Sequence, residues 1–190
     1  RGDGKAASGR SAGGIAREKI HVIVNRGELD RYRPQPRDNL LAREFGLEGK
    51  FVVGYIGTHG LAHALDEVLE AAELLRDRND IVFFFAGAGA ARARVEQCTA
   101  ERKLDNVRLI PRQPKSRMPA IWNLCDLALV PLRDTPVFAT VIPSKIFEAM
   151  GMGVPMLMSV PEGEATAIMR DTGSGVCVPP QTPTAMADRK

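Results

Sequence analysis

The chain has 190 residues, 44% of them hydrophobic and 26% charged, a balance typical of a folded globular domain. A net charge of only +3 and an aromatic content of 5% favour neither a nucleic-acid partner nor a base-stacking surface. Three widely separated cysteines, Cys98, Cys125 and Cys177, favour reduced thiols and a cytoplasmic address. The longest apolar runs are too short to cross a bilayer, and no signal peptide opens the chain.

The chain opens with a low-complexity stretch. Residues 1–14 are mainly Gly, Ala and Ser with scattered Arg and Lys, a composition that cannot bury a core. We therefore expect a disordered tail over residues 1–17 and one domain over residues 18–190. The tripeptide Arg1-Gly2-Asp3 spells an adhesion motif, but its low-complexity setting favours chance.

From Lys19 onward, short apolar segments alternate with segments whose apolar residues recur every three or four positions. The apolar segments predict strands at 20–24, 51–56, 81–86, 107–110, 127–131, 154–159 and 175–178. The periodic segments predict helices at 37–45, 61–76, 90–103, 116–124, 144–150 and 162–170, with a further helix at the end of the chain. Alternating helices and near-continuously apolar strands indicate an α/β fold, a Rossmann-like doubly wound parallel sheet with helices on both faces. Such a sheet binds ligands outside the carboxyl ends of its strands.

The first loop at that edge is Gly57-Thr58-His59-Gly60, between a strand and a helix. Its glycines let backbone approach a ligand, and its N–H groups at a helix start favour an anion. A tight turn without a ligand would leave the same pattern. His59 and His63 have the four-residue spacing of metal ligands, but Gly60 disfavours a common helix through both, so we expect no metal.

The second loop, at residues 87–92, half-matches the dinucleotide fingerprint Gly-x-Gly-x-x-Gly. Arg92 stands where the third glycine belongs, and no acidic residue ends the next strand to hold a ribose. A nicotinamide-dependent dehydrogenase therefore remains a weak alternative.

The third loop leads into the helix expected at 144–150. Pro143 suits a helix start, and Gly151 and Gly153 suit its end. The three- and four-residue spacing places Ile146, Phe147 and Met150 on one face, which we expect to be the core face.

Ser144, Lys145 and Glu148 then share the other side of this helix. A hydroxyl and a cation would lie at the positive helix end, with a carboxylate one turn further in. A nucleoside diphosphate fits this arrangement, its phosphates at the helix start and its ribose on the carboxylate. A solvated face with a Lys145–Glu148 ion pair is the other interpretation.

Together these segments resemble the family-four (group 1) retaining glycosyltransferases of the GT-B fold, from near Lys19 to about Pro183. Their order along one chain is specific. The segments that carry the resemblance are 19–25, 29–34, 54–58, 85–89, 106–111, 128–132 and, most sharply, 143–155.

The resemblance implies a donor-binding half that takes a UDP-sugar and transfers a hexose or amino sugar, with retention, to a surface polysaccharide or lipid-linked acceptor. It gives Lys145 and Glu148 the catalytic contacts, Glu148 through the donor ribose. The diphosphate would lie on Pro143, Ser144, Lys145 and the Ile146 amide. Residues 57–60 and His63 would close over the phosphates, and backbone near Arg112 and Gln113 would meet the base.

The same resemblance implies that an N-terminal acceptor domain and the last helices are missing, so we expect this chain alone to be inactive. Peripheral contact with the inner membrane face through the missing half stays open. Three positions depart from the family pattern. Thr140 replaces an acidic residue, Thr58 and His63 stand where Arg and Lys are usual, and Arg26 replaces a glycine. A sugar-nucleotide epimerase of the same fold and a non-catalytic nucleotide-binding module remain alternatives.

Overall fold

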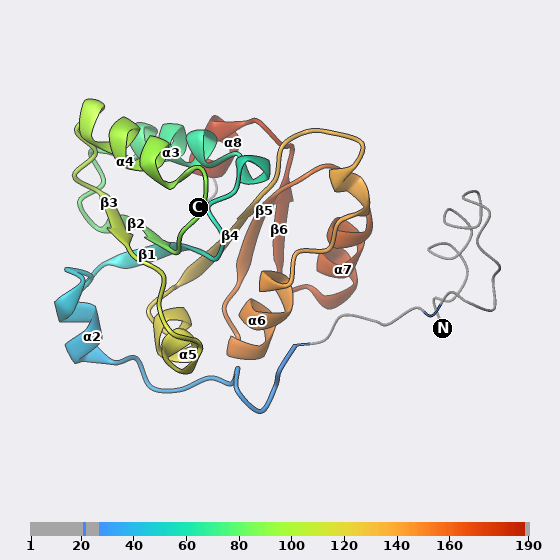
Figure 1. Cartoon of the computed structure of the whole chain (residues 1–190), viewed down its shortest axis with the longest axis horizontal. Helices are drawn as coiled ribbons and strands as arrows, with labels where there is room; N and C mark the ends of the chain where they lie inside the picture. The colour runs from blue at the N-terminus through green and yellow to red at the C-terminus, as the bar shows by residue number, and fades with distance from the viewer. Residues whose placement is uncertain (1–20, 22–26, 189–190) are drawn as a thin grey trace.

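The computed structural model describes residue 21 and residues 27–188. They form one parallel sheet with the strand order β3-β2-β1-β4-β5-β6 (Figure 1). This order confirms the predicted doubly wound fold. The strands are β1 (Phe51–Ile56), β2 (Ile81–Ala86), β3 (Val107–Ile110), β4 (Leu127–Pro131), β5 (Met156–Ser159) and β6 (Gly175–Val178).

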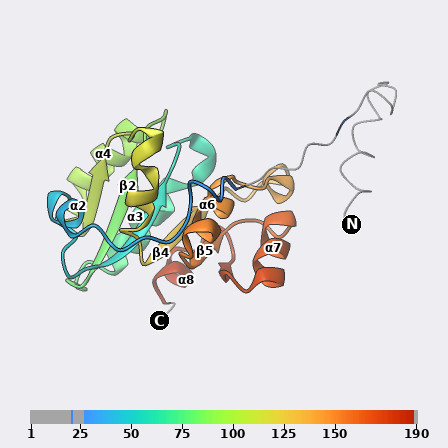
Figure 2. The ribbon, with the colours of Figure 1, turned by 90° about the horizontal axis from the view of Figure 1, so that it is seen from below.

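Helices cover both faces of the sheet (Figures 1 and 2). Alternate strand residues supply the two halves of the core: Val52 and Phe84 face one layer, and Val53 and Phe85 face the other. The first layer contains α2 (Asn39–Glu44), α5 (Met118–Trp122), α6 (Lys145–Met152) and α7 (Glu164–Thr172). The second contains α3 (Leu65–Leu74), α4 (Arg92–Glu101) and α8 (Pro183–Ala187).

Five strands, β1, β2, β3, β4 and β6, match their predicted bounds, whereas several helices begin later than expected. The helix predicted from residue 61 is wrong in its first turn, where a 3₁₀ turn (η3, Leu61–His63) ends at Ala64 in a left-handed conformation with φ of 43°. The helix predicted at 116–124 likewise opens with a 3₁₀ turn (η4, Lys115–Arg117). A third 3₁₀ turn, η5 (Phe138–Thr140), was not predicted.

The end of α6 explains why β5 starts two residues later than the predicted 154–159. Gly153 caps the helix with φ of 68°. The amide of Val154 then donates to the carbonyl of Ala149 at 3.0 Å, closing a Schellman-type turn. Since this amide completes the helix, the strand can begin only after Pro155.

The glycines of the 87–92 loop are explained by backbone packing. A Cβ added at Gly87 would lie 1.8 Å from the carbonyl oxygen of Gly57, and one at Gly89 would lie 2.5 Å from that of His59. The amide of His59 donates to the carbonyl of Ala88 at 2.9 Å. The Gly-x-Gly pair therefore lets two loops touch, and it needs no dinucleotide to account for it.

Some sequence predictions fall outside the described residues. They are the tail at 1–17 with its Arg1-Gly2-Asp3 tripeptide, the strand at 20–24 and the departure at Arg26. The domain limits stay predictions. Within the described part of the chain, no helix has the length and apolarity needed to span a membrane.

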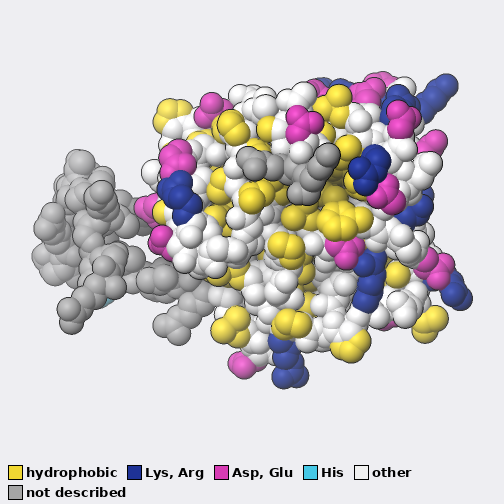
Figure 3. All heavy atoms as spheres, turned by 180° about the vertical axis from the view of Figure 1, so that it is seen from behind, with side chains coloured by type: hydrophobic (Ala, Val, Ile, Leu, Met, Phe, Trp, Pro, Cys, Tyr) yellow, Lys and Arg dark blue, Asp and Glu magenta, His cyan; other side chains and the backbone are white. Residues whose placement is uncertain are grey.

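Charges of both signs are mixed on the face opposite the view of Figure 1. Lys and Arg side chains lie there among Asp and Glu, and apolar side chains gather near the middle (Figure 3). The described part of this face therefore presents no continuous basic surface, in keeping with the small net charge of +3.

Gly87→Ala should destabilise the fold by about 2 kcal/mol or more, because the new methyl group would overlap the Gly57 carbonyl. The matched control is Gly49→Ala. Its φ of +66° is also unfavourable for alanine, but nothing lies within 4 Å of the added methyl group, so about 1 kcal/mol is expected. Urea unfolding of both variants measures the difference, and equal losses would show that the loop contact contributes nothing.

Candidate functional site

A cavity of about 1160 Å³ lies at the carboxyl edge of the sheet. It is bounded by the segments that follow β1 and β4, neighbouring strands at which the strand order reverses. This is where doubly wound sheets bind ligands. Of the predicted site residues, the cavity is lined by Gly57, Thr58, His63, Arg112, Gln113, Pro143, Ser144, Lys145 and Glu148.

Three predicted site residues do not line this cavity. The His59 ring is fully buried, with its centroid 5.6 Å from that of Tyr55 and 6.2 Å from that of Phe85. Ile146 is fully buried in the core, and its amide already donates to the carbonyl of Pro143 at 3.1 Å. The predicted contacts of the His59 side chain and the Ile146 amide with phosphate are therefore not supported.

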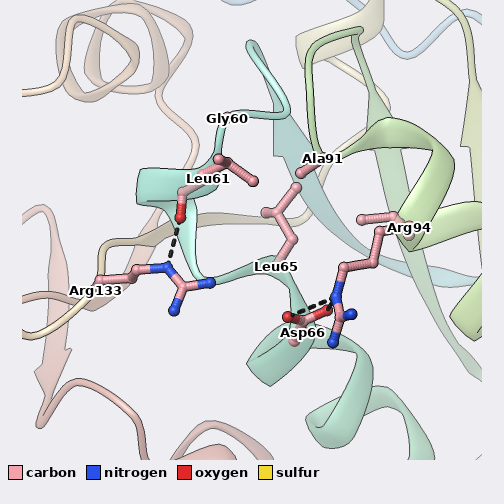
Figure 4. A pocket seen from close by; sticks show the side chains of 8 residues that line it. Gly60, Leu61, Leu65, Asp66, Ala91, Arg94 and Arg133 are labelled. Atoms are coloured by element: carbon pink, nitrogen blue, oxygen red, sulfur yellow. Dashed lines mark hydrogen bonds and ion pairs between the residues drawn. The ribbon is translucent and has the colours of Figure 1, made fainter.

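The third, Gly60, lines a separate cavity of about 420 Å³ (Figure 4). Leu61 and Leu65 contribute apolar surface there, and two arginines lie at its sides. Arg94 pairs with Asp66 at 3.0 Å, and Nε of Arg133 donates to the carbonyl of Leu61. Because both guanidinium groups already have partners, this smaller cavity offers an anion no unpaired cation.

The start of α6 presents free backbone donors. In the described part of the chain, no acceptor takes the amide hydrogens of Ser144 and Lys145. The Ser144 side chain is exposed and makes no capping bond. The first-turn amides and the positive helix end therefore form an anion site, displaced by one residue from the predicted Ile146 amide.

Lys145 is buried, with 7% of its surface exposed, and its Nζ has no hydrogen-bond partner among the described residues. The ammonium lies 3.8 Å from the centroid of the Tyr55 ring. Burial lowers the pKa of Lys145 to about 7, and the nearby charge of Glu148 opposes that shift. No ion pair joins Lys145 to Glu148 among the described residues. The alternative of an exposed ion pair is therefore wrong.

His63 lies on the same side of the cavity. Its Nδ1 is buried and has no partner in the described part of the chain. Burial, followed by the charge of Lys145, lowers the pKa of His63 to about 4. It is therefore neutral at pH 7, and it can offer one N–H to a phosphate oxygen.

Sequence reasoning missed Tyr55, which organises this corner. Its ring contacts Lys145 and lies 5.9 Å from His63, centroid to centroid. Its hydroxyl donates to the carbonyl of Thr58 at 2.5 Å. Tyr55 therefore contacts both the loop at residues 57–60, through Thr58, and the side chain of Lys145. The one available signal was a tyrosine near the end of a strand that leads into a glycine loop.

Glu148 lies one turn into α6, half-buried, with its carboxylate at the cavity. Its Oε2 accepts a hydrogen bond from Nε1 of Trp122 at 3.0 Å. Tyr32 also lines the cavity. Burial raises the pKa of Tyr32 to about 12, with the charge of Glu148 as the second cause. Sequence reasoning missed both of these neighbours because they come from distant segments.

The remaining predicted contacts are looser. Arg112 is exposed and Gln113 half-buried at the cavity rim, and Gln113 donates to the carbonyl of Pro111 at 3.1 Å. Thr140 is exposed in η5, does not line the cavity, and donates to the carbonyl of Val137 at 2.9 Å. Among the described residues, no group of three or more His, Cys, Asp or Glu side chains is arranged to hold a metal.

Comparisons with known proteins bear on the family and the fold of this chain. A family model described as "Glycosyl transferases group 1" matches residues 38–189. The chain is 28% identical, over 178 residues, to the Escherichia coli protein named "Putative colanic acid biosynthesis glycosyl transferase WcaI", covering 91% of this chain and 43% of that protein. It is 31% identical, over 175 residues, to the D-inositol 3-phosphate glycosyltransferase of Nocardia farcinica, covering 87% and 37%. The chain thus spans less than half the length of these relatives.

The fold also resembles a solved structure of HepE from Anabaena in complex with UDP and glucose. The TM-score is 0.72 at 18% identity, and the match covers 96% of this chain and 49% of HepE. At this identity the likeness supports the fold.

Lys145→Met should stabilise the chain in the absence of ligand, because it removes a buried ammonium that has no hydrogen-bond partner in the described part of the chain. A gain of about 1 kcal/mol would raise the midpoint of thermal unfolding by about 2–4 °C. The pKa of Lys145 is lower in the fold than in the unfolded chain. The cost is therefore largest near pH 7 and below, and the gain should shrink as pH rises toward 10.

The matched control is Lys115→Met, at a lysine that lines the same cavity but is exposed. Calorimetry should show no gain for this variant. An unchanged or lower midpoint for Lys145→Met at pH 7 would mean that the ammonium is already compensated.

Proposed function

The chain belongs to the group 1 glycosyltransferase family, and from this we propose that it is the donor half of a two-domain transferase that uses a UDP-sugar. The observation that carries the proposal is the buried ammonium of Lys145 beside two amides at the start of α6, all three without a hydrogen-bond partner among the described residues. A dianionic diphosphate supplies the charge and the acceptor oxygens that this corner lacks.

Each part of the cavity takes one part of the donor. The diphosphate lies on the amides of Ser144 and Lys145, with His63 and the loop at Gly57 and Thr58 beside it. Gly57 permits this approach, because its φ of 131° favours glycine and an added Cβ would lie 3.5 Å from Nζ of Lys145. The ribose hydroxyls bind Glu148, and the base lies toward Arg112 and Gln113.

The hard chemical step is the departure of the nucleoside diphosphate, as negative charge grows on its leaving oxygen. The α6 dipole and the free amides lie where this charge develops, and they are fixed before the reaction begins. Lys145 adds a full positive charge in a poorly solvated corner, where electrostatic stabilisation is stronger than in water. The acceptor hydroxyl attacks from the face that the leaving group vacates, with retention.

The comparisons support the finer parts of the proposal. HepE was solved with UDP and glucose, and WcaI is named for colanic acid biosynthesis. We propose a hexose or amino sugar as the transferred group and a surface polysaccharide or its lipid-linked precursor as the acceptor. The acceptor site and any peripheral membrane contact would belong to the N-terminal half. The three cysteines, all free, support a cytoplasmic location.

Titration calorimetry tests donor binding directly. We expect UDP to bind this chain and to shift the amide resonances of Ser144 and Lys145, because both N–H groups lack an acceptor. NADPH is the control ligand, since a dinucleotide site would prefer it. A spectrum unchanged at saturating UDP, or tighter binding of NADPH than of UDP, would overturn the proposal.

UDP affinity should fall as pH rises above 7. The pKa of Lys145 in the free site is about 7, and a bound diphosphate would raise it because it favours the charged form. Above pH 7 binding must therefore take up a proton, and Kd should rise by up to about tenfold per pH unit. His63, with a pKa of about 4, stays neutral throughout and adds no slope.

The measurement is Kd between pH 7 and 9, where the UDP phosphates are already fully ionised. Lys145→Met is the control, and it should bind weakly with no slope. A flat profile for the unmodified chain would remove Lys145 from the diphosphate site.

A further inference from the structure

The carboxylate of Glu148 has two neutral polar neighbours that the roles above leave unexplained. Trp122, at the end of α5, is fully buried, and its Nε1 donates to Oε2 at 3.0 Å. Tyr32, from the segment before α2, has 7% of its surface exposed and lies beside the same carboxylate, whose charge helps to raise the pKa of the Tyr32 phenol. Three segments far apart in the sequence thus meet at one side chain.

Tyr32 is brought to this position by a close approach to α6. A Cβ added at Gly151 would lie 2.9 Å from the Tyr32 carbonyl oxygen and 3.2 Å from its Cβ. Gly151 is three residues after Glu148, so both lie on the same side of the helix. The glycine therefore leaves the room that lets Tyr32 reach the carboxylate.

Neither neighbour neutralises the carboxylate. An arginine at either place would compensate the charge of Glu148, whereas an indole and a phenol bring no charge. A carboxylate has about four acceptor positions. The Trp122 indole fills one of them, the Tyr32 phenol limits the space on another side, and the positions that remain toward the cavity suit a pair of neighbouring hydroxyls.

We propose that Trp122 and Tyr32 are positioning residues that hold Glu148 ready to accept the 2′- and 3′-hydroxyls of ribose, so that the site selects ribonucleoside over 2′-deoxyribonucleoside diphosphates. The inference rests on the proposed donor function and adds the source of its sugar selectivity. Neither residue touches the reacting atoms. Both act through the orientation of Glu148.

The test compares the Kd values of UDP and dUDP for the whole 190-residue chain. Loss of a hydrogen bond to a charged acceptor should make dUDP about 10- to 100-fold weaker than UDP. In Trp122→Phe this ratio should fall to within a few-fold of one, and in Tyr32→Phe it should fall partway. UDP should still bind both variants, because the phosphate contacts are unchanged.

A double-mutant cycle separates positioning from general packing. Glu148→Ala should itself lower the ratio to about one, and adding Trp122→Phe to it should change the ratio no further. The matched control is Phe45→Leu, which alters an aromatic residue packed against the same core away from Glu148. It should keep the ratio of the unmodified chain even if its stability falls.

A measurement on the unmodified chain tests the same inference even if the variants fail to fold. Trp122 is the only tryptophan in the chain, so its indole N–H gives a single resonance. Saturating UDP should shift this resonance clearly, and saturating dUDP should shift it much less. An indole resonance indifferent to bound UDP would overturn the inference.

The inference and the proposed function fail in different ways. If UDP binds and Glu148→Ala abolishes the preference for UDP but Trp122→Phe retains it, the positioning role is wrong and the donor site stands. If the unmodified chain binds neither nucleotide, the donor site itself is wrong.

Discussion

The buried ammonium of Lys145 is the constraint on which the rest of the site depends. Removing an ammonium from water is costly unless an anion or several acceptors replace the solvent. Here the replacement is one aromatic face, that of Tyr55, at 3.8 Å. Cation–π attraction offsets only part of the desolvation cost. Under the proposed function, the anion that compensates this charge is the bound diphosphate, and the stability of the site then depends on its ligand.

That arrangement requires the first two loops of the carboxyl edge to touch each other. The contact between Gly87 and the Gly57 carbonyl fixes the loop after β1 against the loop after β2. The Tyr55 hydroxyl then fixes Thr58. The ring of Tyr55 packs against the buried rings of His59 and Phe85, whose centroids lie 5.6 and 5.9 Å away. The Lys145 ammonium thus faces a packed aromatic ring, which offers it no hydrogen-bond acceptor.

The sequence predicted the strands well because each depends on a local pattern, and most of the predicted site residues line one cavity. Five strands had correct bounds, since a buried parallel strand is a continuous apolar run. The helix containing Lys145 and Glu148 was found from its proline, its glycines and its spacing. Orientation was harder to predict. Ile146 and His59 were predicted to contact the ligand. Instead, the Ile146 amide donates to the carbonyl of Pro143, and the His59 ring packs against two aromatic rings.

Residues that act across the fold gave no local signal. Trp122 lies 26 positions before Glu148, and Tyr32 comes from a segment before the first described helix. Their meeting depends on α5 and α6 lying together over the same face of the sheet. Spacing along one element predicts which side chains share a helix face, but not which neighbours arrive from other elements. The neighbours from other elements determine how a carboxylate is oriented. The selectivity of a site is therefore harder to predict from sequence than the presence of its binding residues.

One short helix links the two parts of the site. Lys145 and Glu148 lie three residues apart on α6, a helix of eight residues whose Ile146 and Ala149 are fully buried. The start of α6 and the Glu148 carboxylate therefore keep a fixed separation, because both belong to one helix that is anchored in the core. In the proposed donor site, a ligand would present its negative charge and its paired hydroxyls at the separation that this helix turn sets, about 5–6 Å between side-chain origins. Inorganic phosphate meets only the first requirement and a free sugar only the second, so the full binding energy is available to a molecule that joins the two.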